Sequence, residues 1–366
     1  MSADSEQVRR KFHTLDGMRG VAAILVVTRH GSQYIAPFVF PNSFLAVDLF
    51  FMLSGFVIAA AYDDRLRTGR LTPLRFMLVR YIRLWPLYLM GTLLGAFVLY
   101  SKTIHGKSGI DLGIFWRAMP TQLMMLPSPG TRDFYTYNLV AWSLFFELFI
   151  NFVYALVFRR LNTAVLAAVA AASVVVLVYS ELNVQYGINN GWLWSDAGVS
   201  FARVGFAFSI GVLIYRHRTQ LPKLNVPSIG VILLLASVLM IQAPEQCLGL
   251  IQIVSIVICF PLLVVAAVEV EPSRRLVPLF TWLGVTSYAV YNLHHPLLTI
   301  FEYLMSKASI PIFDYSPWSG FAAIALIMLI AWIADRVYDV PVRAWLTQRT
   351  LGKFTSNPGR AKRIGA

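Results

Sequence analysis

Charged residues are scarce in this chain. Asp, Glu, Lys and Arg make up 13% of its 366 residues, about half of the roughly 25% that soluble domains carry. Hydrophobic residues make up 57%. This balance excludes an ordinary soluble domain and predicts a polytopic membrane protein.

Cysteines and recognisable cofactor motifs are also few. The two cysteines, Cys247 and Cys259, lie in or beside apolar segments, which argues against a disulfide framework or a cysteine metal site. The sequence contains no glycine-rich phosphate loop, metal-ligand cluster or Ser-x-x-x-Lys pair. We therefore expect no metal site and no permanently bound cofactor.

The net charge of +13 is explained by membrane topology. Most of the 31 Lys and Arg residues fall in segments that are cytoplasmic when the N-terminus is cytoplasmic, as the positive-inside rule requires. This distribution predicts two cytoplasmic termini and argues against nucleic-acid binding. The basic segment 360–363 is expected to contact anionic inner-leaflet lipids. The predicted outer loops hold only Lys102, Lys107, Arg117, Arg132 and Lys307.

The apolar runs predict an all-α fold of about ten transmembrane helices around a central polar pore. We expect a cytoplasmic tail over residues 1–14, one membrane domain over 15–345 and a basic cytoplasmic tail over 346–366. The apolar stretch 113–126 is predicted to be a re-entrant or interfacial helix. The predicted spans are residues 20–38, 44–61, 77–99, 138–158, 163–180, 201–215, 226–243, 249–268, 281–304 and 318–337.

Arg19 and His30 lie on one face of the first predicted helix. They are eleven residues apart, which places them within about 20° of each other around the helix and roughly 16 Å apart along its axis. That distance is about half of a 30 Å hydrocarbon core. Placing an ionisable group inside a membrane-spanning helix costs free energy, so such a group is interpreted first as part of a functional site. The pair suggests a ligand with an anionic head and a long arm that enters the bilayer.

Arg80 and Arg83 are one turn apart at the inner end of the third span. Two guanidiniums at that position suit a phosphate, because each can bind it with two parallel hydrogen bonds. Ordinary snorkelling to the membrane surface is the alternative. Arg19 favours the phosphate site, because the three cations together could surround one anionic nucleotide.

Two of the carboxylates inside predicted spans are candidate site residues. Asp48 lies near the outer end of the second span, at a depth similar to that of His30, and it could orient the imidazole or serve as a structural hydrogen-bonding group. Ser143 and Glu147 begin a polar stripe on the fourth span. Glu147 could buffer a proton, orient His30, or neutralise Arg29 or Arg203.

The ninth span carries a further polar face. Ser287, Tyr291 and His294 share one side of the helix at i, i+4 and i+7, while Tyr288 and His295 share another. Spacing alone therefore does not choose between the two histidines. A histidine before a proline kink could also be a structural hydrogen-bond donor.

Taken together, these stretches resemble the acyltransferase-3 family of bacterial membrane acyltransferases, which modify surface polysaccharides and related glycans. Any one of them is weak, but all five occur in the family's order across nearly the whole domain. They are Leu15-Asp-Gly-Met-Arg-Gly20 with His30, Val47-Asp-Leu-Phe-Phe-Met-Leu-Ser-Gly-Phe56, Arg80-Tyr-Ile-Arg-Leu-Trp-Pro-Leu-Tyr88, Trp142-Ser-Leu-Phe-Phe-Glu147 and Ser287-Tyr-Ala-Val-Tyr-Asn-Leu-His294-His-Pro296.

The resemblance implies ten helices and an acyl-coenzyme A donor that is used from the cytoplasm. The family's Arg-x10-His motif falls on Arg19 and His30, and its Arg-x-x-Arg motif on Arg80 and Arg83. The family's acid falls on Glu147, and its His-x-Pro element selects His294. The chain departs from the pattern at Ala46, Leu148 and Arg29.

The predicted function is transfer of an acyl group, most simply acetyl, from acyl-CoA to a hydroxyl of a surface or lipid-linked glycan at the bacterial inner membrane. The inner arginines would hold the coenzyme's phosphates. The acyl arm would then thread through a continuous channel to His30, which acts as a general base or forms a covalent acyl intermediate. Asp48 or Glu147 would orient the ring, with Ser143, Tyr291 and His294 as a substrate-binding or structural polar core. The alternative is a transporter or flippase of a glycan intermediate.

Overall fold

A computed structural model describes residues 11–38, 40–184 and 187–352. Within these ranges the chain is helical, apart from loops and one isolated bridge between Asp133 and Leu193. The predicted all-α fold is therefore confirmed. Most of the two predicted tails, including the basic segment 360–363, lies outside the described residues.

Within the described part of the chain, seven helical segments are long and apolar enough to cross a membrane. Each coincides with a predicted span. The segments are Ser43–Arg67, Pro73–Ile104, Leu139–Val157, Thr163–Asn183, Trp194–His217, Glu245–Glu269 and Trp318–Thr350.

The other three predicted spans fall on α1 (His13–His30), α9 (Ser228–Met240) and α12 (Val277–Lys307). α9 has 13 residues, which makes it about 20 Å long. α1 and α12 are less apolar, because α1 carries two arginines and an aspartate and α12 carries two adjacent histidines. The count of ten stays a prediction, and the most polar helices are those on which we expected the chemistry.

Local sequence sets several helix ends. Thr72 caps α4 (Pro73–Ile104) by accepting a hydrogen bond from the Arg75 amide, and Asp111 caps α5 (Leu112–Leu123) in the same way. α5 has 12 residues and lies where a short re-entrant or interfacial helix was expected. The remaining α-helices are α2 (Ser32–Ile35), α3 (Ala46–Arg67), α4 (Pro73–Ile104), α5 (Leu112–Leu123), α6 (Trp142–Val157), α7 (Thr163–Asn183), α8 (Ala197–His217), α10 (Glu245–Val254), α11 (Phe260–Glu269), α13 (Trp318–Ala334) and α14 (Val340–Thr350).

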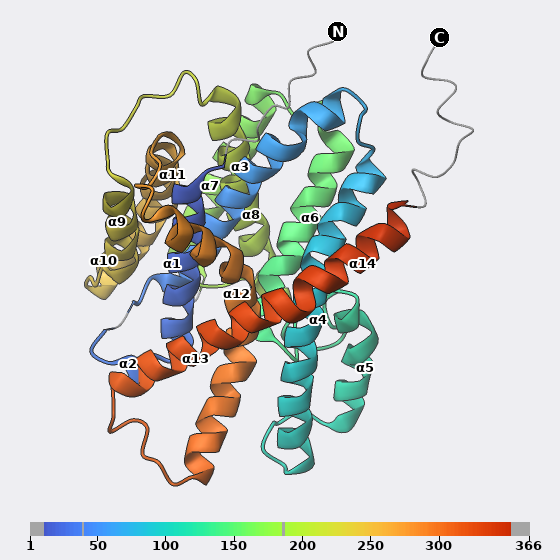
Figure 1. Cartoon of the computed structure of the whole chain (residues 1–366), viewed down its shortest axis with the longest axis vertical. Coiled ribbons are helices and arrows are strands. Elements are labelled where there is room, and N and C mark those ends of the chain that lie inside the picture. The colour runs from blue at the N-terminus through green and yellow to red at the C-terminus, as the bar shows by residue number, and fades with distance from the viewer. Residues whose placement is uncertain (1–10, 39, 185–186, 353–366) are drawn as a thin grey trace.

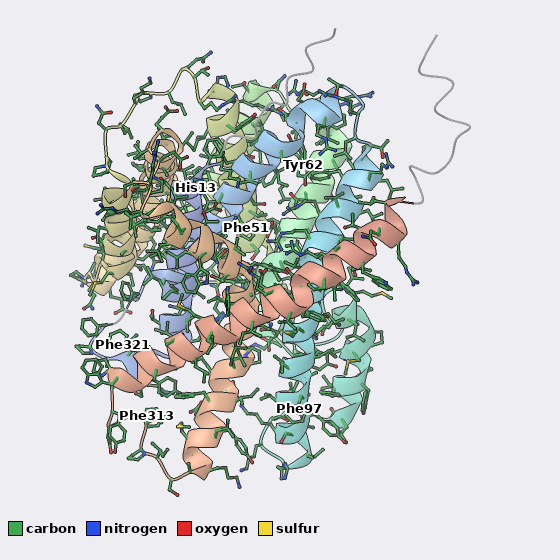
Figure 2. All side chains as sticks on the ribbon, in the orientation of Figure 1. His13, Phe51, Tyr62, Phe97, Phe313 and Phe321 are labelled. Atoms are coloured by element: carbon green, nitrogen blue, oxygen red, sulfur yellow. The ribbon has the colours of Figure 1, made fainter. Side chains whose placement is uncertain are left out.

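The helices form a bundle in which α1 packs on α12 and α3 packs on α8, while α4 contacts both α6 and α12. Figure 1 shows α13 and α14 as one long helix that crosses in front of α12 and α4. In Figure 2, His13 and Tyr62 lie toward one end of the molecule, and Phe97 and Phe313 lie toward the other. The start of α1 and the end of α3 therefore share one end of the bundle.

Glycines allow the closest helix contacts. A Cβ on Gly20 of α1 would come within 2.4 Å of the Leu283 side chain on α12. On α3 and α8, a Cβ on Gly55 or Gly211 would come within 2.2 or 2.0 Å of a backbone carbonyl oxygen of the partner helix. Small residues are the usual means by which membrane helices approach this closely. The two close pairs, α1 with α12 and α3 with α8, fix the helices that carry the site.

Candidate active site

One cavity of about 200 Å³ lies among α1, α3, α4, α6 and α12. Its polar wall contains all three predicted phosphate-binding arginines, Arg19, Arg80 and Arg83, together with Glu147. The rest of the wall is largely apolar and comes mainly from α3, including Val47 and Phe50. Folding thus brings arginines from two separate helices to one concave surface.

Arg19 is held by groups on its own helix and on α12. Its Nε donates to the hydroxyl of Ser287 (2.9 Å), and its Nη2 donates to the carbonyl oxygen of Gly284 (2.6 Å). Nη2 also pairs with Asp16, one turn earlier on α1 (3.1 Å). The guanidinium is therefore fixed at the α1–α12 contact and faces the cavity rather than lipid.

Arg80 is paired with Glu147. Its Nη2 lies 2.7 Å from Oε1 of the carboxylate, and Ser54 donates to the same oxygen over 3.0 Å. Nε of Arg80 is buried and has no hydrogen-bond partner among the described residues. Of the roles considered for Glu147, neutralising an arginine is what the structure shows, but the arginine is Arg80 rather than Arg29 or Arg203.

Arg83 is less firmly held than Arg80. Its guanidinium stacks on the ring of Tyr288, with 5.4 Å from Cζ to the ring centroid. Its Nη1 lies 3.6 Å from Oδ2 of Asp339 and makes no hydrogen bond within the described part of the chain. Because the side chain is one-third exposed, it can offer hydrogen-bond donors to an anion in the cavity.

Asp48 pairs with Arg203 and not with His30, which favours the structural role over orientation of the imidazole. Its carboxylate forms a two-point ion pair with Arg203 of α8, at 3.0 Å from Nε to Oδ1 and 2.7 Å from Nη2 to Oδ2. Both side chains are almost fully buried. Arg203 also donates to the carbonyl oxygens of Asn190 and Phe44. Since Asp48 and Arg203 satisfy each other, the pair joins α3 to α8.

His30 is the last residue of α1 and is exposed. Its Nδ1 lies 3.2 Å from the carbonyl oxygen of Val26 and 3.2 Å from Nε2 of His294. The ring of His295 is 5.5 Å away, centroid to centroid. Among the described residues neither Asp48 nor Glu147 contacts His30, so His294 supplies the orienting side chain that sequence reasoning assigned to a carboxylate.

The backbone determines which nitrogen of each ring carries the proton. Nδ1 of His294 faces the carbonyl oxygens of Tyr291 (2.7 Å) and Val290 (3.2 Å), so this nitrogen must donate. In the neutral ring Nε2 is then an acceptor. Nδ1 of His30 therefore faces two acceptors, Val26 and His294, and must also carry its proton. The unprotonated nitrogen of neutral His30 is Nε2, and a base at this position would act through it.

Within the described part of the chain, the cavity that contains the arginines does not reach His30, so it does not form the predicted continuous channel. The cavity ends at Ser143 and Tyr291, whose hydroxyls are 2.7 Å apart, and the Tyr291 hydroxyl also donates to the carbonyl oxygen of Val140. None of the three clustered histidines lines the cavity in the described part of the chain. Tyr291 thus separates the arginines from His30, because its ring closes the cavity while its backbone carbonyl binds His294.

Arg29, the unusual charge beside His30, is directed away from the histidines. Its Nη1 donates to the carbonyl oxygen of Pro41 and its Nη2 to Oδ1 of Asn189, while the guanidinium lies 5.1 Å from the centroid of the Phe44 ring. These contacts tie the end of α1 to two loops.

Comparison with known proteins gives the family. Residues 12–335 match the acyltransferase-3 family model, described as an acyltransferase domain. A relative from Rhizobium radiobacter named "Protein 2 in picA locus" is 40% identical over 190 residues, which cover 48% of this chain and 96% of the relative. A relative from Komagataeibacter xylinus named "Putative membrane-bound transacylase BcsY" is 25% identical over 314 residues, covering 80% of this chain and 74% of the relative. No solved structure matches the chain significantly.

The matched region contains every residue that lines the cavity and all three clustered histidines. The family resemblance predicted from five short stretches is thereby confirmed over most of the chain. This chain belongs to the acyltransferase-3 family and is a membrane acyltransferase.

Proposed function

We propose that this protein transfers an acyl group, most simply acetyl, from cytoplasmic acyl-CoA to a hydroxyl of a surface or lipid-linked glycan. The observation that carries the proposal is the convergence of Arg19, Arg80 and Arg83 on one cavity. The far wall of this cavity is Tyr291, whose backbone carbonyl oxygen accepts a hydrogen bond from His294 of the histidine cluster. We further propose that the enzyme lies in the bacterial inner membrane with both termini in the cytoplasm.

The arginines suit the nucleotide end of the donor. Guanidiniums bind phosphate with two parallel hydrogen bonds, and Arg80 and Arg83 each have a buried nitrogen without a hydrogen-bond partner among the described residues. The apolar wall formed by α3 suits the uncharged pantetheine arm. The thioester would then lie deepest, against Tyr291.

His30 would provide the base. Its Nε2 takes the proton of the acceptor hydroxyl while that oxygen attacks the thioester carbonyl, the carbon–sulfur bond breaks, and the proton passes to the leaving thiolate. The products are an acyl ester and free coenzyme A thiol. General-base catalysis contributes about 10²–10⁴-fold. In the second version of the mechanism, Nε2 attacks the thioester carbonyl and the coenzyme A thiolate leaves. The acceptor hydroxyl then attacks the acyl group on His30, which frees the imidazole, and the hydroxyl proton passes to the thiolate.

Either version requires Tyr291 to move, because its side chain separates the cavity from the histidines. We expect Tyr291→Phe to keep transfer within a few-fold of wild type, since it removes the bonds to Ser143 and Val140 but keeps the ring. Tyr291→Trp should abolish transfer by filling the passage. Initial rates with labelled acetyl-CoA measure both effects. A Tyr291→Phe enzyme as inactive as a His30 variant would instead make the hydroxyl part of the chemistry.

The arginine assignment predicts a specific loss of donor affinity. Replacing one charge-assisted contact costs about 1.5–3 kcal/mol, so Arg83→Gln should weaken acetyl-CoA binding by about tenfold or more. Arg80→Gln should do the same, with an added stability cost because Glu147 loses its partner. Equilibrium binding to the purified protein measures this, and Arg75→Gln on the same helix, outside the cavity wall, is the matched control. Equal affinity in all variants would contradict the assignment.

The acceptor is tested in cells. Mass analysis of surface polysaccharide from strains with and without the gene should show loss of acyl groups in the deletion strain. A flippase would instead leave unmodified glycan inside the cell, but the family match already favours the enzyme. A deletion strain with fully acylated surface and lipid-linked glycans would overturn the proposed acceptor class.

A further inference from the structure

A second charged cluster lies beside Arg83, on the segment that joins α13 to α14. Asp335 and Asp339 are the first and last residues of a π-helical turn, and Arg343 lies one turn later on α14. Asp339 is fully buried and its Oδ2 is 2.8 Å from Nη2 of Arg343 and 3.6 Å from Nη1 of Arg83. One carboxylate oxygen therefore lies between guanidiniums from two different helices.

The backbone explains how this contact arises. α14 packs against α4, and Figure 1 shows it crossing α4 as the continuation of α13. A π-turn adds one residue to a helical turn and is frequent at functional sites. Here it occurs where α13 passes into α14. The family match ends at residue 335, so Asp339 and Arg343 lie beyond it.

The contacts of Asp339 with Arg83 and Arg343 indicate its effect on the position of Arg83. Asp339 does not line the cavity, whereas Arg83 does and is one-third exposed. An anion in the cavity could therefore reach Arg83, while Asp339 lies outside the cavity wall. Without the carboxylate, Arg83 would lose its acidic partner and be repelled by Arg343, which would keep its pair with Asp335. Arg83 would then leave its position on Tyr288.

We propose that Asp339 is a positioning residue that holds the Arg83 guanidinium at the cavity wall for the donor's phosphate. The inference rests on the proposed use of acyl-CoA. It adds the C-terminal helix α14, through Asp339 and Arg343, to the part of the protein that determines donor affinity.

The test is a double-mutant cycle on acetyl-CoA affinity, measured by equilibrium binding to purified full-length protein. Asp339→Asn should weaken binding by about tenfold, equivalent to about 1.4 kcal/mol. In an Arg83→Gln background the same change should have almost no effect, because residues that act through one contact are not additive. Asp335→Asn is the matched control: it is buried on the same turn, and its ion pair is with Arg343 (3.7 Å) rather than with Arg83, so it should leave affinity unchanged.

Equal losses of affinity from Asp339→Asn in both backgrounds, or tighter binding caused by removing a negative charge, would overturn the proposal. If Asp339→Asn does not fold, Asp339→Glu keeps the charge and should fold with affinity within a few-fold of wild type. A purely structural role would predict loss of stability in the Asp335→Asn and Asp339→Asn proteins alike, with affinity unchanged in whatever protein folds. Wild-type protein that does not bind acetyl-CoA would contradict the proposed function itself and is separate from these outcomes.

Discussion

Replacement of His30 by alanine is expected to lower the rate of acyl transfer by about 10²–10⁴-fold, the usual contribution of a positioned general base. The available lone pair of neutral His30 is on Nε2, which alanine removes. Because His30 is exposed at the end of α1, the variant should insert and fold normally. The measurement is transfer of labelled acetyl from acetyl-CoA to glycan in membranes that contain equal amounts of protein.

Two further variants test whether the loss of transfer is specific to His30. His294→Ala should reduce transfer by less than His30→Ala, since it removes the acceptor that helps orient His30 but leaves Nε2 in place. His105→Ala, in the turn that directly follows α4, where the ring contacts the carbonyl oxygen of Ser101, should have no effect. Full activity in His30→Ala protein would show that another group accepts the proton.

Breaking the Asp48–Arg203 pair should produce the largest loss of stability in the molecule. Removing one partner of a buried ion pair leaves an uncompensated charge and costs about 3–5 kcal/mol. We therefore expect Asp48→Ala and Arg203→Ala each to lower the free energy of unfolding by about that amount. Denaturant or thermal unfolding of purified protein measures it.

The activity of the same variants separates a structural from a catalytic Asp48. Replacing both residues together with apolar side chains, Asp48→Leu with Arg203→Met, should recover part of the stability, because well-packed apolar groups often match a buried ion pair. Transfer per folded molecule should stay within a few-fold of wild type in that double variant. A double variant that is stable but has lost acyl transfer would show that Asp48 takes part in the reaction.

Local pattern was sufficient for the helices and for the arginine site. Apolar runs and caps are properties of adjacent residues, so each predicted span coincides with a helix. Arg80 and Arg83 are fixed relative to each other by one helical turn, and the face they share predicted their common wall. The pairing of Arg203 with Asp48 was missed, because Arg203 was considered as a partner of Glu147, although Asp48 was available at a similar depth.

The partners of the charged groups followed only from the tertiary structure. Asp48 and Arg203 are 155 residues apart in the chain, and His30 meets His294 across 264. Helical periodicity gives the direction in which a side chain leaves its own helix, but not which neighbouring helix lies there. The sequence therefore allowed several cations as ion-pair partners of Glu147, and only helix packing places Arg80 beside it.

The sequence by itself determined the membrane class, the helical elements and the family to which this protein belongs. Its apolar runs are set by the cost of placing polar side chains in lipid, and its helices by the cost of placing unpaired backbone groups there; both costs act on each segment separately. The tertiary structure decided that the cavity ends at Tyr291 and that a histidine rather than a carboxylate orients His30. Both depend on side chains from helices distant in sequence, whose close approach is set by glycine contacts and buried ion pairs.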